Sequence, residues 1–86
     1  MFKVQKKDKS LQDFDKAKIV GVILKAGGHS ELGQKVADKV EAWLPSAAKD
    51  NVVDHKEIWT KVAELLKEED IITAGKFTTY EKSLER

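Results

Sequence analysis

The sequence predicts an α+β fold: a four-helix bundle capped by a small N-terminal β-hairpin or three-stranded sheet. Short stretches within the first 14 residues alternate apolar and polar side chains, the period of two that is typical of strands. From residue 15 onward, four segments place apolar side chains three or four residues apart, which indicates amphipathic helices. Because 86 residues suit one domain, we expect a single domain over residues 1–86.

The hairpin is expected to pair residues 2–6 with residues 11–14 through a polar turn at residues 7–10. No Asn-Gly or Asp-Gly pair occurs in this turn, so the sequence leaves the turn type open. Val52 and Val53 are β-branched and follow an irregular polar stretch, so they are candidates for a third short strand.

The first helix is expected over residues 16–26, with Asp15 as its N-cap and Gly27-Gly28 as its stop signal. The second helix is expected to begin with Ser30 as its N-cap and to end at Pro45, since proline rarely continues a helix. The apolar stripe of this second helix consists of Leu32, Val36, Ala37, Val40, Trp43 and Leu44.

Asp54 is the expected N-cap of a third helix, and residues 67–70 form a polar break before a fourth helix. The buried face of the third helix is expected to contain Ile58, Val62, Leu65 and Leu66. The fourth helix is expected to line the core with Ile72, Phe77, Tyr80 and Leu84.

Composition excludes several kinds of site and partner. The absence of cysteine excludes disulfides, thiolate zinc sites and cysteine nucleophiles. Sixteen Lys and Arg against fifteen Asp and Glu give a net charge of +1, so bulk charge does not favour a nucleic-acid partner. No apolar run approaches the roughly 20 residues of a membrane span, so we expect no membrane association and a cytoplasmic location.

Motifs for catalysis and metal binding are also lacking. Gly75-Lys76 is the only Gly-Lys pair, and Phe77 stands where a P-loop needs Ser or Thr to bind magnesium. His29 and His55 are the only histidines, and no spacing suggests that they converge on a metal. The acidic residues fall on polar helix faces, where a solvated surface is the better explanation. We expect no catalytic residues, no metal-binding residues and no enzymatic activity.

Residues 4–19, VQKKDKSLQDFDKAKI, resemble the opening motif of the ATP-cone domain: roughly V-x-K-R-D-G, an apolar residue, an acidic or amide residue, then K-I. An Ala- and Val-rich helix at residues 36–44, the segment VVDHKEIWTKVAELL and a final helix around residues 76–80 follow in the same order. ATP-cones are regulatory nucleotide-binding modules of ribonucleotide reductases and of the repressor of their genes. The resemblance implies a four-helix bundle under a three-stranded sheet, in agreement with the residue pattern.

The resemblance also implies a nucleotide site in the N-terminal motif. Val4 would touch the base, and Lys6 and Lys7 would contact the phosphates. Gln12 and Asp15 match positions that contact base or sugar in the family. Lys7 replaces the usual arginine, so the two-pronged fit of a guanidinium to phosphate is lost.

Four further residues complete the implied site. Lys18 and Ile19 match the K-I pair, as a phosphate partner and an apolar wall, and His55 and Trp59 would close the pocket from the third helix. Each has an ordinary structural alternative: a lysine on a polar face carries no function, and Ile19 and Trp59 suit the core. Asp15 is also the helix cap. The hairpin lysines alone would equally suit a solvated edge strand.

The expected function is a non-catalytic regulatory module that binds ATP or dATP as an effector and couples nucleotide level to conformation or oligomerisation. The expected partners are an adenine nucleotide and a ribonucleotide reductase or regulator domain. A homo-oligomer, Mg²⁺ as companion of the triphosphate, and the choice between ATP and dATP are left open. The alternative is a protein-interaction or nucleic-acid-contacting domain that keeps the ATP-cone fold without nucleotide binding. Two departures favour that alternative: Lys9 replaces the family's glycine and resists a positive φ, and Lys7 replaces its arginine and lacks the guanidinium fork.

Overall fold

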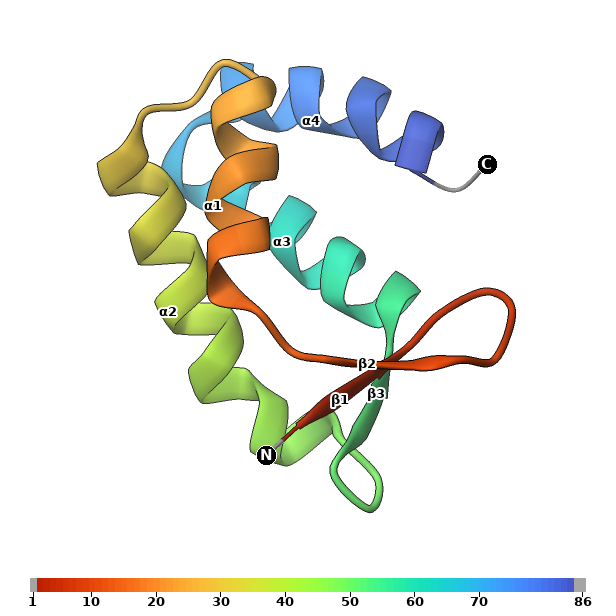
Figure 1. The fold of residues 1–86 in the computed structure, drawn as a ribbon. Coiled ribbons are helices and arrows are strands. Elements are labelled where there is room, and N and C mark those ends of the chain that lie inside the picture. The colour runs from red at the N-terminus through yellow and green to blue at the C-terminus, as the bar shows by residue number, and fades with distance from the viewer. Residues whose placement is uncertain (1, 85–86) are drawn as a thin grey trace.

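A computed structural model describes the backbone of residues 2–84 and the side chains of residues 2–79. Its described part contains three short strands and four helices, with the third strand between the second and third helices (Figure 1). The strands are β1 (Lys3–Gln5), β2 (Leu11–Asp13) and β3 (Val52–Asp54). The helices are α1 (Lys16–Lys25), α2 (Ser30–Ala47), α3 (His55–Glu69) and α4 (Ile71–Leu84). This arrangement confirms the predicted α+β class and the third strand.

The sheet has the order β2-β1-β3, so the N-terminal strand lies in its centre. β1 runs antiparallel to β2 and parallel to β3, and Val4 lies opposite Gln12 on one side and Val53 on the other. These three side chains therefore share one face of the sheet, and the buried Val53 shows that this face meets the helices. On the opposite face, Lys3 forms an ion pair with Asp13 across the hairpin.

The hairpin turn is a tight loop in which one residue adopts a left-handed backbone. The N–H of Lys9 donates to the carbonyl of Lys6 at 3.0 Å, and the N–H of Lys6 donates to the carbonyl of Ser10 at 2.9 Å. Lys9 has a φ of 74°. Lys9 is thus the last residue of a four-residue turn. A left-handed residue at this place is common in hairpin connections, and glycine is preferred there.

The substitution Lys9→Gly should therefore raise the free energy of unfolding by about 0.5–1 kcal/mol. Relief of the left-handed strain, about 1–2 kcal/mol, exceeds the extra unfolded-state entropy of glycine. Urea denaturation followed by circular dichroism measures the change. Lys67→Gly, the same exchange on an exposed position of α3, should instead lower stability by about 0.5–1 kcal/mol. Equal losses in both variants would contradict a strained turn.

The core lies between the four helices and the inner face of the sheet. α2 packs against α1 and α3, and α4 packs against α3 and α1. The largest fully buried side chains come from all four helices and β3: Ile23, Val36, Val40, Leu44, Val53, Val62, Leu66 and Phe77. Because β2 leads directly into α1 and β3 into α3, the N-terminal ends of these two helices meet the sheet (Figure 1).

Both predicted ends of α2 are wrong. His29 and not Ser30 is the N-cap, since the Nδ1 atom of His29 accepts a hydrogen bond from the N–H of Leu32 at 3.1 Å. The helix also continues past Pro45 to Ala47. A proline lacks its own N–H donor, but the residues after it can still donate backwards, as Ala48 does to Leu44 at 2.8 Å.

The junction between α3 and α4 is shorter than the predicted break at residues 67–70. Lysine and glutamate favour helix, so α3 continues through Glu69. Asp70 alone separates the helices, and its carboxylate accepts hydrogen bonds from the N–H of Ile72 at 3.1 Å and the hydroxyl of Thr73 at 2.9 Å. These hydrogen bonds, from Thr73 first, hold the pKa of Asp70 below its usual value.

The buried face of α4 differs from the predicted one. Because α4 begins at residue 71, Thr73, Ala74 and Phe77 face the core, whereas Ile72 is 70% exposed. Phe77 is confirmed as a core residue, and Ile72 is a wrong prediction. The predicted core side chains Tyr80 and Leu84 lie outside the described side chains.

Glu69, the last residue of α3, forms ion pairs with α2. Its carboxylate accepts hydrogen bonds from the ammonium groups of Lys35 at 2.8 Å and Lys39 at 3.0 Å. These contacts, from Lys35 first, hold the pKa of Glu69 below its usual value of 4.5. Within residues 2–84, no helix combines the length and apolar character needed to cross a membrane.

Candidate functional site

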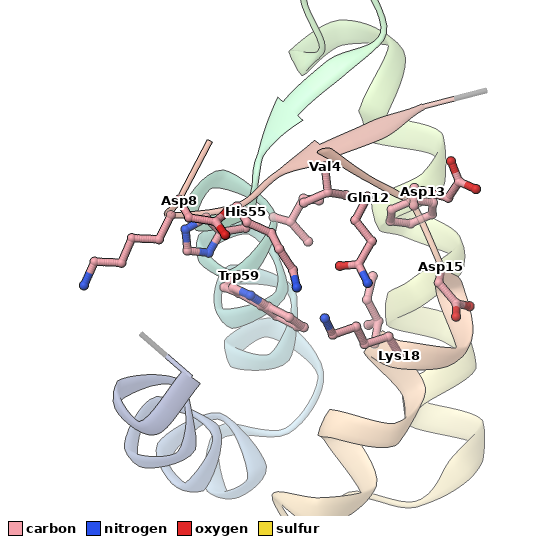
Figure 2. A pocket seen from close by; sticks show the side chains of 13 residues that line it. Val4, Asp8, Gln12, Asp13, Asp15, Lys18, His55 and Trp59 are labelled. Carbon is pink, nitrogen blue, oxygen red and sulfur yellow. The ribbon is translucent and has the colours of Figure 1, made fainter. Parts of the chain in front are cut away.

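A cleft of about 400 Å³ lies between the hairpin and the N-terminal parts of α1 and α3 (Figure 2). We call it the hairpin cleft. Its lining consists of Val4, Lys6, Lys7, Asp8, Gln12, Asp13, Phe14, Asp15, Lys18, Ile19, His55, Ile58 and Trp59. The volume falls within the range of about 300–1,000 Å³ that is typical of small-molecule sites.

The base of the hairpin cleft is apolar. Ile19 on α1 and Ile58 on α3 are buried there, and the half-buried Val4 and Phe14 extend the apolar surface toward the sheet. Trp59 is only 8% exposed, yet it lines the cleft. An apolar surface with an aromatic side chain suits a flat, partly apolar ring system.

Trp59 is at the same time part of the core. Its ring lies 6.1 Å from that of Phe77, centroid to centroid, at an interplanar angle of 47°. Such tilted aromatic pairs stabilise a core beyond their buried area. Trp59 therefore lines the hairpin cleft and at the same time packs against α4 through Phe77.

The rim of the hairpin cleft carries positive charge from two elements. Lys6 and Lys7 extend from the hairpin and Lys18 from α1, and all three are exposed. Among the described side chains, neither Lys6 nor Lys18 forms an ion pair within 4 Å. Figure 2 places Lys18 and Gln12 on the side opposite His55 and Trp59, so the polar groups face one another across the opening.

The three carboxylates around the hairpin cleft each have a local partner. Asp13 pairs with Lys3 on the far face of the sheet, and Asp15 accepts a hydrogen bond from the N–H of Ala17 at 2.9 Å as the N-cap of α1. Asp8 accepts hydrogen bonds from the N–H and hydroxyl of Ser10 at 3.0 and 2.6 Å. The Ser10 hydrogen bonds lower the pKa of Asp8, and Lys6 adds a smaller effect.

All nine residues that the sequence assigned to a nucleotide site lie in this one cleft. Four lining residues were missed: Asp8, Asp13, Phe14 and Ile58. Asp8, Asp13 and Phe14 are close in sequence to Lys7 and Gln12 in the hairpin, and this proximity is the one sequence signal that could have found them. Ile58 was expected only in the core, and it is both a core residue and a wall residue.

For three of the predicted site residues, a structural role and a place in the lining of the hairpin cleft occur together. Asp15 caps α1 and lines the hairpin cleft, and Ile19 and Trp59 belong to the core while presenting an edge to it. Among the described residues, no group of three or more His, Asp or Glu side chains could hold a metal ion. Three lysines above an apolar base suit an anionic ligand that carries a ring.

Comparison with known families gives one match, which covers nearly the whole chain. The sequence model of the family described as ATP cone domain matches residues 2–83. No individually curated protein matches the sequence. The matched range contains every strand, most of α4 and all residues of the hairpin cleft.

Proposed function

Because the chain belongs to the ATP-cone family, we propose that it is a regulatory module that binds ATP or dATP in the hairpin cleft. One observation supports this most directly: Lys6, Lys7 and Lys18 line a single cleft whose apolar base includes Trp59. Charge-assisted hydrogen bonds to phosphates are roughly twice as strong as neutral ones, and an apolar base favours the purine.

The parts of the nucleotide have distinct places in this proposal. The purine lies against Val4 and Ile19, where the surface is apolar, and Gln12 and Asp15 offer polar groups to the base or sugar. The triphosphate lies along Lys6, Lys7 and Lys18. His55 and Trp59 close the site from α3.

Two departures from the family motif bear on affinity. Lysine at position 7 supplies charge without the planar fork of arginine, which weakens the hold on a phosphate. Lysine at position 9 adopts the left-handed backbone that the family's glycine would take, so the hairpin turn persists. We therefore expect reduced affinity with the site intact.

The module acts by binding and carries out no chemical step. Nucleotide binding shifts a conformational or association equilibrium, which requires that the two states differ in affinity for the nucleotide. A ribonucleotide reductase or a regulator of its genes is the proposed partner, and a change in self-association is one form the response can take. Mg²⁺ accompanies the triphosphate.

Titration with ATP, dATP and GTP in a Trp43→Phe background tests the proposal. Trp43 and Trp59 are the two tryptophans of the sequence, so the remaining tryptophan emission comes from Trp59 alone, and Trp43 lies outside the hairpin cleft. We expect a saturable change with ATP or dATP and a weaker response to GTP. Raised salt should weaken binding, because charges at an exposed rim are screened over about 10 Å at 0.1 M ionic strength.

Amide NMR shifts provide the second measurement. Binding in the hairpin cleft should move the signals of residues 4–19. An unchanged Trp59 emission together with unchanged amide signals would leave the fold standing and remove nucleotide binding from this chain. The domain would then act through a protein or nucleic-acid partner.

A further inference from the structure

Asp8 is an acidic residue in a cleft otherwise suited to an anion. It lies in the hairpin turn directly after Lys6 and Lys7 and lines the hairpin cleft with them. In Figure 2 it lies on the same side of the cleft as His55. An ionised carboxylate beside a triphosphate repels the phosphate oxygens, so its presence needs an explanation.

The hydrogen bonds of Asp8 leave one oxygen available. Both contacts from Ser10 go to Oδ1, at 3.0 Å from the backbone N–H and 2.6 Å from the hydroxyl. Within the described part of the chain, no hydrogen bond reaches Oδ2. The same contacts lower the pKa of Asp8, so the group is charged at neutral pH. The turn thus holds a fixed negative charge with one free oxygen.

The other two carboxylates of the hairpin cleft are less suited to a cation. Asp13 is neutralised by Lys3, and Asp15 is committed to the first turn of α1. Asp8 is also the acidic residue nearest in sequence to the two hairpin lysines. A cation between Asp8 and the phosphates would turn the repulsion into attraction.

We infer that Asp8 recognises the divalent cation carried by the nucleotide, so that the hairpin cleft selects the Mg²⁺ complex of ATP over free ATP. This inference rests on the proposed function. Mg²⁺ keeps several waters and binds through one or two carboxylates plus substrate phosphates, which matches a single aspartate at a phosphate site. In this inference, phosphate oxygens and water supply the remaining ligands of the cation.

Calorimetric titration with ATP, in excess Mg²⁺ or in excess EDTA at matched ionic strength, tests the role of Asp8. Wild type should bind the Mg²⁺ complex at least about tenfold more tightly than free ATP, the effect of one ionic contact near a protein surface. In Asp8→Asn the ratio should fall below about threefold, because free ATP is no longer repelled. Asparagine can still accept the hydrogen bonds from Ser10, so the turn is retained.

Asp50→Asn is the matched control, since it removes the same charge from an exposed position outside the hairpin cleft, and asparagine tolerates the left-handed backbone there. It should keep the wild-type ratio between the affinities for the Mg²⁺ complex and for free ATP. Manganese in place of magnesium gives a second measurement: with ATP present, it should broaden the amide signals of residues 6–10 in wild type and not in Asp8→Asn. Mg²⁺ without nucleotide should cause no shift.

Three results with the variants would overturn the role of Asp8. One is an unchanged Mg²⁺ ratio in Asp8→Asn, and another is an equal loss in Asp50→Asn. The third is broadening by manganese that persists without Asp8. If wild type binds no ATP in either condition, the proposed function itself is wrong. If wild type binds ATP with the same affinity in excess Mg²⁺ and in excess EDTA, the proposed function stands and only this inference is contradicted.

Discussion

Replacing Phe77 with alanine should lower the free energy of unfolding by about 3–5 kcal/mol, the usual cost of removing a fully buried aromatic ring. Phe77 is 0% exposed and contacts Trp59 at 6.1 Å between ring centroids. The loss is a large part of the roughly 5–15 kcal/mol that holds a typical domain together. Urea denaturation followed by circular dichroism measures it.

Ile72→Ala on the same helix is the matched control. Ile72 is 70% exposed, so its truncation should change stability by less than about 0.5 kcal/mol. The pair tests which face of α4 is buried. A large loss in Ile72→Ala with a small loss in Phe77→Ala would show that α4 is rotated relative to the structure described here.

Replacing Lys6 and Lys18 together with glutamine should weaken ATP binding by about 100-fold or more. Each lysine offers a charge-assisted hydrogen bond to phosphate, and such a bond contributes about 1.5–3 kcal/mol. The two come from the hairpin and from α1, so a phosphate held between them loses both anchors. Calorimetry at fixed ionic strength measures the dissociation constant.

Lys25→Gln with Lys67→Gln removes the same charge from exposed positions outside the hairpin cleft. This control should bind ATP within about threefold of wild type, since distant surface charges are screened. Both double variants should retain wild-type stability within about 0.5 kcal/mol per substitution. Equal affinities of the two double variants would contradict a phosphate site at Lys6 and Lys18.

The hairpin and its turn illustrate what a residue pattern can predict. Alternation of apolar and polar side chains was enough to place β1 and β2, because the period of a strand is local. The turn geometry was not predictable, since lysine at position 9 gives no sign of a left-handed backbone. Hydrogen bonds from Lys6 and Lys9 impose that conformation on it.

The end of α1 and the start of α2 show a second limit. Ser30 is the stronger N-cap by preference, yet His29 takes the position. Gly28 packs so closely on Ile23 that an added Cβ would lie 2.7 Å from its Cγ2 atom. This contact belongs to the turn that ends α1, where the N–H of Gly28 donates to the carbonyl of Ile23 at 2.9 Å, and N-cap preference alone does not report where that turn releases the chain into α2.

Prediction of the hairpin cleft requires knowledge of which elements contact one another, which local sequence patterns do not contain. Periodicity places His55 and Trp59 on one face of α3, but it does not show which element that face meets. Only the family resemblance related them to Lys6 and Lys18 before the fold was known. Their shared location is now a structural fact, whereas their part in nucleotide binding stays a prediction.

The parallel pairing of β1 with β3 has a consequence for the order of assembly. β1 is made first, yet its central place in the sheet requires β3, which follows α1 and α2 along the chain. Such distant contacts carry a loop-closure entropy and form late in folding. The pairing of β1 with β2 is local, whereas the sheet is complete only once β3 has been made, and the hairpin cleft also needs the first turns of α3.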